Sequence, residues 1–203
     1  MQITRSKLLS ILFLMMGTIF IGKAFYMDAK AELAQYLIDS AWHSREAGQP
    51  AAKPWPWADT YAVAKIEVPR LNIVQYIMRD ASGESLAFGP GHLAQSALPA
   101  SVGHSMVAGH RDSHFEFIKN LIIGDTVIIS NYHNDRQSYR VNKAVEFDTR
   151  TEQLNLTGQD MLTLITCYPF NELVPGGPLR WIVDATPVPS TGTLSNNVEI
   201  GAI

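Results

Sequence analysis

The stretch that decides the fold is residues 161–170, which read Met-Leu-Thr-Leu-Ile-Thr-Cys-Tyr-Pro-Phe. The first six residues are apolar or β-branched, which is typical of a buried strand. Cys167 closes this run. The Tyr168-Pro169-Phe170 segment must end the strand, because a proline cannot donate a hydrogen bond to a neighbouring strand. The sequence therefore predicts a short buried strand with a cysteine at its end.

Further short strands are expected on both sides of this one, because β-branched or alternating runs recur between turn residues. They cover Tyr61–Val68, Leu71–Met78, Leu86–Phe88, Ser105–Ala108, Thr126–Ser130, Ser138–Phe147 and Leu179–Ala185. The region contains only one expected short helix, at Phe115–Leu121. Eight strands separated by turns indicate an all-β domain, either a closed antiparallel or mixed barrel or a sandwich.

The N-terminus has the pattern of a membrane anchor. Arg5 and Lys7 precede an uncharged run over residues 8–22. Extension of this run to residue 27 gives about 30 Å of helix, roughly one hydrocarbon core. The preceding basic residues favour a cytoplasmic N-terminus and an exported remainder. A cleaved signal peptide is the alternative, because residues 29–31 (Ala-Lys-Ala) resemble a cleavage site.

The rest of the chain divides into three further parts. Residues 28–59 are expected to form a juxtamembrane helix, ended by Gly48, and then a linker with the Pro54-Trp55-Pro56-Trp57 string. The two tryptophans could clamp the linker to the domain or lie at the membrane interface. Residues 60–185 hold the strand-rich domain, and residues 186–203 are expected to be a loose tail. The helix carries an apolar stripe formed by Ala34, Leu37, Ile38, Ala41 and Trp42.

Composition excludes several classes of function. The 203 residues carry a formal net charge of −3, so the chain lacks the basic excess typical of nucleic-acid-binding proteins. It has one cysteine, which allows neither an intramolecular disulfide nor a thiolate metal cluster.

Cys167 is the first candidate for chemistry, because strand ends that face loops often carry catalytic residues. A cysteine nucleophile needs a base or a cation nearby to form and hold the thiolate. His110 is the favoured partner, since it ends another strand-like run just after Gly109, and His104 and His114 are its rivals.

Arg180 is the third candidate, because an arginine between apolar residues at a strand start needs a partner. It could stabilise the oxyanion of an acyl transfer. The alternative is a structural ion pair with Asp112 or Glu172. Arg111 is a second candidate for the oxyanion contact.

These residues together resemble the sortase family. Residues 163–167 (Thr-Leu-Ile-Thr-Cys) match the TLxTC signature, Arg180 matches the catalytic arginine, and residues 108–111 match the strand that delivers the catalytic histidine. Residues 55–60, 109–115 and 167–170 resemble class GN, the sortases of Gram-negative bacteria. One departure is His104, where an Asn or another small polar residue is expected.

The resemblance implies an eight-stranded sortase β-barrel and a transpeptidation. Cys167 would attack an exported protein at a C-terminal sorting signal of LPxTG type and form a thioacyl enzyme. His110 would act as acid and base, and Arg180 would stabilise the oxyanion. Thr166 and Arg180 would contact the sorting signal. An amine nucleophile would accept the acyl group, with no cofactor or metal and no nucleic acid involved. The enzyme would sit in the inner membrane with one span and its catalytic domain in the periplasm.

Two other functions remain in competition. One is a different Cys-His acyl transferase, such as an L,D-transpeptidase, although that family has a Ser-x-Gly-Cys type context where this chain has Thr166 before Cys167. The other is a non-catalytic exported barrel that binds peptides.

Overall fold

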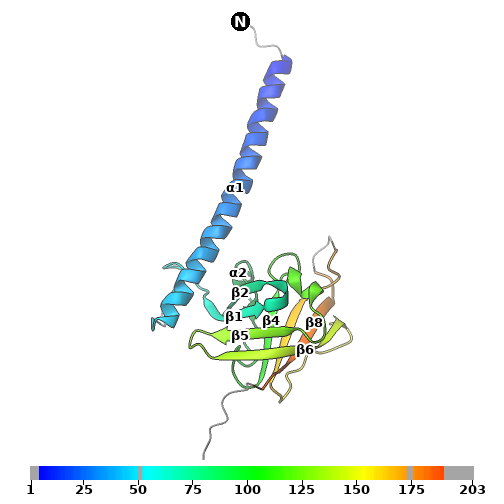
Figure 1. Cartoon of the computed structure of the whole chain (residues 1–203). Helices are drawn as coiled ribbons and strands as arrows, with labels where there is room; N and C mark the ends of the chain where they lie inside the picture. The colour runs from blue at the N-terminus through cyan, green and yellow to red at the C-terminus, as the bar shows by residue number, and fades with distance from the viewer. Residues whose placement is uncertain (1–4, 50–51, 173–175, 190–203) are drawn as a thin grey trace, which may run out of the picture. The chain divides into compact units, whose positions relative to one another are not determined.

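The structure is a computed structural model that describes residues 5–49, 52–172 and 176–189. The chain forms two compact units, and the first ends at Ala62 where the second begins at Val63. The first holds the long helix α1 (Arg5–Glu46), and the second holds a β-barrel (Figure 1). The remaining elements are β1 (Ala62–Val68), η1 (Pro69–Leu71), β2 (Ile73–Met78), α2 (Gly83–Leu86), β3 (Gly91–His92), β4 (His104–Gly109), η2 (Glu116–Asn120), β5 (Thr126–Asn131), β6 (Arg136–Asp148), β7 (Met161–Cys167) and β8 (Leu179–Pro187).

Helix α1 runs through both segments that the sequence predicts as helical. No proline interrupts residues 5–46, so the helix continues unbroken from the apolar run into the amphipathic stretch. It ends where expected. Gly48 has φ +89° and donates its N–H to the Arg45 carbonyl, a left-handed backbone that glycine adopts at helix ends.

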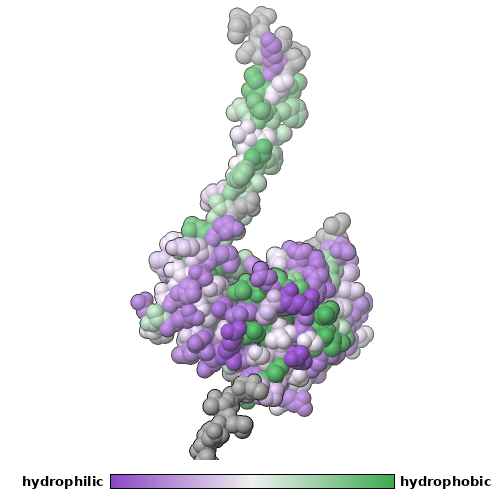
Figure 2. All heavy atoms as spheres, in the orientation of Figure 1, coloured by the Kyte–Doolittle hydropathy of each residue, from purple (hydrophilic) through white to green (hydrophobic). Residues whose placement is uncertain are grey.

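The two parts of α1 differ in exposure. The large apolar side chains between Leu8 and Met27 are exposed, and Figure 2 shows them along the helix. In the second part, the predicted stripe residues Ala34, Ile38, Ala41 and Trp42 are buried. Within the described chain, α1 is the helix that is long and apolar enough to cross a membrane, which fits an anchor or a signal sequence. Of the two tryptophans in the linker, Trp57 is 79% exposed and Trp55 is partly buried.

The strands form one closed barrel with the order β1-β2-β3-β4-β7-β8-β6-β5. The β4–β7 and β2–β3 pairs are parallel and the other described pairs are antiparallel, so the barrel is mixed. Its core contains side chains from most strands and from the loop after β4. These include Ile66, Ile77, Val107, Phe115, Ile129, Tyr139, Leu164 and Val183. The eight-stranded barrel predicted from the sequence is confirmed.

One predicted strand is wrong. Residues 86–88 lie at the end of the short helix α2 and in the turn after it, and the strand in this part of the chain is β3, at residues 91–92. The Ser82 side chain caps α2 by accepting the Ser85 N–H. This cap is favoured at helix N-termini and outweighs the weak strand propensity of three residues. The predicted helix at Phe115–Leu121 is present as the 3₁₀ helix η2.

Gly91 offers a test of the packing between β2 and β4. It pairs with Met78 on one side and Ala108 on the other, and a Cβ there would meet the Asp80 carbonyl and lie 2.7 Å from the Ala81 Cα. We expect Gly91→Ala to lower the free energy of unfolding by about 1–3 kcal/mol, because backbone atoms cannot rotate away.

The matched control is Gly83→Ala, where a Cβ has nothing within 4 Å. It should leave stability unchanged or raise it slightly, since alanine favours a helix. Chemical denaturation of both variants measures the difference. Equal stabilities would contradict the tight packing described around Gly91.

Candidate active site

Alternation along β7 separates the core from an outer face. Leu162 and Leu164 belong to the barrel core. Successive side chains of a strand point to opposite faces, so Thr163, Ile165 and Cys167 lie on the outer face. Cys167, at the end of β7, is only partly buried and is a free cysteine.

Strand pairing brings the three predicted residues into one row at one end of the barrel. Cys167 pairs directly with Arg180 in the antiparallel β7–β8 ladder. In the parallel β4–β7 ladder, Gly109 pairs with Thr166, and continuation by one residue places His110 beside Cys167. Cross-strand partners point to the same face, so the row His110–Cys167–Arg180 lies on the outer face. His110 is exposed, and Arg180 is partly buried.

Thr166 has a different environment from the one expected of a substrate contact. Its side chain is 2% exposed, and its hydroxyl donates a 2.7 Å hydrogen bond to the Gly109 carbonyl. This bond joins the ends of β4 and β7 directly beneath His110 and Cys167. The placement of Thr166 therefore favours a role in holding the two strand ends together over a side-chain contact with a sorting signal.

The two arginines near Cys167 are held differently. Arg111 is 7% exposed, and its guanidinium donates to the Pro169 carbonyl at 2.7 Å, to the Glu172 carbonyl and to the Asp112 carboxylate. It thus fastens the loop after Cys167 to the chain after His110. These bonds and its burial leave the Arg111 guanidinium fewer accessible donors than that of Arg180.

Arg180 donates through Nη1 to the carbonyls of Gly177 and Leu179, at 2.6 and 2.8 Å. Among the described residues it makes no ion pair with a carboxylate, so the predicted alternative of a pair with Asp112 or Glu172 is not found. Two local carbonyls fix one end of the guanidinium. An arginine has five N–H donors, so most of its donor capacity remains available beside Cys167.

Three aromatic rings support the same end of the barrel. Tyr168 stacks on Trp181 with ring centroids 5.4 Å apart, and Phe170 meets both rings edge-on at 5.7 and 5.8 Å. These residues directly follow Cys167 and Arg180 in the chain. The cluster therefore limits how far the row can shift.

A pocket of about 280 Å³ lies on the outer face near this row. Its floor comes from β6, β7 and β8, and its wall comes from residues 152–157 of the β6–β7 loop. Phe147, the register partner of Arg180, lines the pocket and links it to the row. The floor is apolar near Phe147, Val145 and Ile182 and becomes polar at Thr163 and Asp184. The sequence shows no local signal for this pocket, because its residues are far apart in the chain.

The rival histidines lie outside the row. His104 begins β4, six residues and roughly 20 Å of strand before His110, and lies buried in the pocket wall. Burial lowers the pKa of His104, partly offset by the nearby Asp184 carboxylate. His114 is half-buried in the loop after β4. Burial lowers the pKa of His114, and a hydrogen bond with the Ala87 backbone partly opposes that effect.

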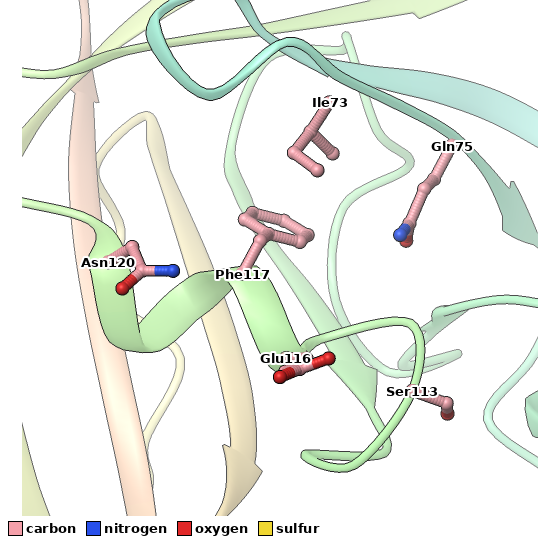
Figure 3. Close-up of a pocket in the computed structure, with 6 residues that line it drawn as sticks. All are labelled: Ile73, Gln75, Ser113, Glu116, Phe117 and Asn120. Atoms are coloured by element: carbon pink, nitrogen blue, oxygen red, sulfur yellow. The ribbon is translucent and has the colours of Figure 1, made fainter.

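A second pocket of about 310 Å³ lies between β2 and η2 (Figure 3). Ile73, Gln75 and Phe117 line it together with Ser113, whose N–H bonds the His110 carbonyl. This second pocket adjoins the loop after His110. Its strand residues come from β2, whereas the floor of the first pocket comes from β6, β7 and β8. The lining residues of the second pocket are spread from Ile73 to Asn120, so no local sequence pattern indicates this pocket either.

His104 and His114, whose pKa values are both lowered by burial, predict how stability depends on pH. A histidine with a lowered folded pKa stabilises the fold fully above its unfolded value of 6.5, and this contribution is lost as the pH falls through the folded pKa. We therefore expect Tm to fall between pH 7.5 and pH 5, a range above the ordinary pKa of carboxylates.

Calorimetry over this range checks the expectation. The double variant His104→Gln/His114→Gln lacks both groups and should show a flatter profile. A Tm that is unchanged or rises on acidification of the unmodified chain would contradict the assignment.

Comparisons with known proteins agree with this geometry. A model of the sortase domain matches residues 66–188. Sortase D of Bacillus subtilis (strain 168) is 29% identical over 119 residues, which are 58% of this chain and 60% of that protein. The match thus spans about 60% of the length of this curated relative.

Solved structures show the same fold. A Clostridium perfringens sortase D5 transpeptidase is 24% identical with a TM-score of 0.55, over 64% of this chain and 80% of its own. Sortase C1 from Streptococcus suis is 26% identical with a TM-score of 0.55, over 64% and 75%. A lid mutant of sortase A from Corynebacterium diphtheriae is 21% identical with a TM-score of 0.56, over 80% and 93%. The family model covers more than half of the chain, and this chain therefore belongs to the sortase family.

Proposed function

We propose that this chain is a membrane-anchored cysteine transpeptidase that cleaves a C-terminal sorting signal of LPxTG type on an exported protein. The observation that carries the proposal is the row His110–Cys167–Arg180, set by the pairing of β7 with β4 and β8. A thiol, an imidazole and a guanidinium on one exposed face are the three groups that acyl transfer through a thioester requires.

The reaction has two halves. The Cys167 thiol gives its proton to His110 as the sulfur attacks the carbonyl carbon of the scissile peptide bond, and Arg180 stabilises the negative charge that develops on the carbonyl oxygen. The C–N bond breaks as His110 gives a proton to the leaving amine, which leaves a thioacyl enzyme. An acceptor amine then attacks the thioester, and His110 takes its proton and passes it to the Cys167 sulfur as the C–S bond breaks. A new amide and the free thiol result, and water in place of the amine gives hydrolysis.

The pocket beside the row suits the peptide on the N-terminal side of the scissile bond. It begins at Phe147, next to Arg180, and extends along the outer faces of β7 and β8. Its largely apolar floor can bury apolar side chains of the sorting signal. We therefore assign the substrate contact to Arg180 and to this floor.

We further propose class GN and an inner-membrane location, with the apolar part of α1 as a single span and the barrel in the periplasm. The resemblance of residues 55–60, 109–115 and 167–170 supports the class, and the basic residues before the apolar run support the orientation. The proposed division is an anchor over 1–27, a helix and linker over 28–59, a catalytic barrel over 60–185 and a tail over 186–203. Residues 186–187 belong to β8, and residues 190–203 of the tail lie outside the described residues.

The two alternative functions have no observation in their favour. The match to the sortase model covers the barrel, which argues against an L,D-transpeptidase. A binding barrel without catalysis would need no aligned thiol, imidazole and guanidinium.

Trapping the thioacyl enzyme tests the proposal. The detergent-solubilised full chain is incubated with exported proteins of its host and quenched in acid, and the adduct on Cys167 is identified by mass spectrometry. We expect a peptide that ends in the residue before the scissile bond, and no adduct on Cys167→Ala. An adduct formed equally by Cys167→Ala, or turnover that survives this substitution, would overturn the assignment of the nucleophile.

A pair of lysine variants separates the two arginines. Arg180→Lys keeps the charge but loses the planar fork, so we expect kcat/KM on the trapped peptide sequence to fall about tenfold to a hundredfold with little change in Tm. Arg111→Lys should instead lower Tm, since its guanidinium holds two carbonyls and a carboxylate. Near-normal activity of Arg180→Lys, with a large loss in Arg111→Lys at unchanged Tm, would reverse the two roles.

A further inference from the structure

The β6–β7 loop forms one wall of the pocket of about 280 Å³, which we call the peptide groove. Few hydrogen bonds join this loop to the rest of the protein. All side chains from Arg150 to Asp160 are exposed, including the apolar Leu154 and Leu156. Within the described chain, residues 153–158 make hydrogen bonds to the rest of the protein only at Thr157. The position of this wall therefore depends on one contact, and that contact is made to His104.

A directed chain of hydrogen bonds leads inward from Thr157. The Thr157 N–H donates to His104 Nδ1 at 3.1 Å, and His104 Nε2 lies 2.8 Å from the Thr163 hydroxyl. That hydroxyl donates its one hydrogen to Asp184 Oδ1 at 2.7 Å. Because the hydroxyl hydrogen goes to the carboxylate, the oxygen must accept from His104 Nε2–H. Because the Thr157 amide can only donate, Nδ1 must be unprotonated.

We propose that His104 is a positioning residue whose neutral Nε2–H tautomer fixes the β6–β7 loop and thereby forms the peptide groove of the active site. The inference rests on the proposed function for the identity of the ligand, an extended sorting peptide. The contact between His104 and Thr157, which we call the loop lock, follows from the hydrogen bonds alone. His104 lies at the far end of β4 from His110, so it acts on binding and takes no part in the chemical step.

The lock is sensitive to protons. A second proton on His104 would sit on Nδ1 and face the Thr157 N–H, so this N–H would lose its acceptor, and the longer contact of 3.4 Å between Nδ1 and the Thr157 hydroxyl would alone hold the loop. The charged groups around the imidazole are Asp184 on β8, Lys143 on β6 and Glu152 in the loop. Burial keeps the pKa of His104 below its ordinary value in spite of Asp184, so the lock holds at neutral pH.

Two isosteric substitutions separate the two ends of the imidazole. Asn places its carbonyl oxygen near the position of Nδ1, so His104→Asn keeps an acceptor for Thr157 and loses the donor to Thr163. Gln reaches the position of Nε2, so His104→Gln keeps the donor and loses the acceptor. Both variants replace the ring by a side-chain amide, so each controls for the loss of the ring in the other.

The first measurement needs no substrate. Hydrogen–deuterium exchange of the full chain at pH 7.5 reports the Thr157 amide. We expect exchange about three- to tenfold faster in His104→Gln, the loss of one net hydrogen bond, and near-normal exchange in His104→Asn. In the unmodified chain, exchange corrected for its intrinsic pH dependence should rise as the pH falls to 5, whereas His104→Asn should show no such rise. Equal protection in both variants would overturn the lock.

The second measurement uses a fluorogenic peptide with a Leu-Pro-Ala-Thr-Gly sequence and detergent-solubilised full chain. We expect His104→Gln to raise KM about three- to tenfold with kcat within about twofold, and His104→Asn to keep both near normal. A fall in kcat at unchanged KM would overturn the positioning role. If the unmodified chain does not turn over this peptide, the sorting-signal assignment fails for that sequence, and the exchange result still decides the role of His104.

Discussion

Strand β7 lies between a parallel neighbour, β4, and an antiparallel neighbour, β8. The register of these two ladders determines how His110, Cys167 and Arg180 lie relative to one another at one end of the barrel. The ladders pair Gly109 with Thr166 and Cys167 with Arg180. The Thr166–Gly109 hydrogen bond then closes the two strand ends just where His110 leaves the sheet. A shift of one residue in either ladder would turn its reactive side chain to the other face. The hydrophobic core that sets the register is therefore also what aligns His110, Cys167 and Arg180.

Successive side chains of β7 point to opposite faces, so the strand contributes both to the core and to the outer face. Leu162 and Leu164 pack into the core, while Thr163, Ile165 and Cys167 form successive steps on the outside. Outward from the row, the floor of the groove changes from apolar to polar over about 13 Å. Its polar end meets His104 of β4, so β7 carries the proposed nucleophile at one end and, at Thr163, the hydrogen-bond partner of His104 near the other.

Much of this arrangement could be predicted from the sequence because it is encoded locally. The apolar run before Cys167, the Gly109–His110 strand end and the TLxTC pattern each fall within a few residues. The short strand β3 could not be found, since two residues carry no period and the Ser82 cap favoured a helix next to it. The roles of Arg111 and His104 depend on partners that lie 53 or more residues away in sequence, such as Pro169 for Arg111 and Thr157 for His104. Only the folded barrel shows that Arg111 holds a loop and that His104 lies far from His110.

The most direct test of the central claim is a crystal structure of the protein bound to a sorting peptide whose scissile amide is replaced by a thiol-reactive group. The arrangement described here predicts a covalent bond to the Cys167 sulfur and a carbonyl oxygen facing the Arg180 guanidinium. It also predicts that the peptide runs along the outer face of β7 and β8 beneath residues 152–157. A peptide attached to Cys167 but lying elsewhere on the barrel, with its carbonyl oxygen turned away from Arg180, would contradict it.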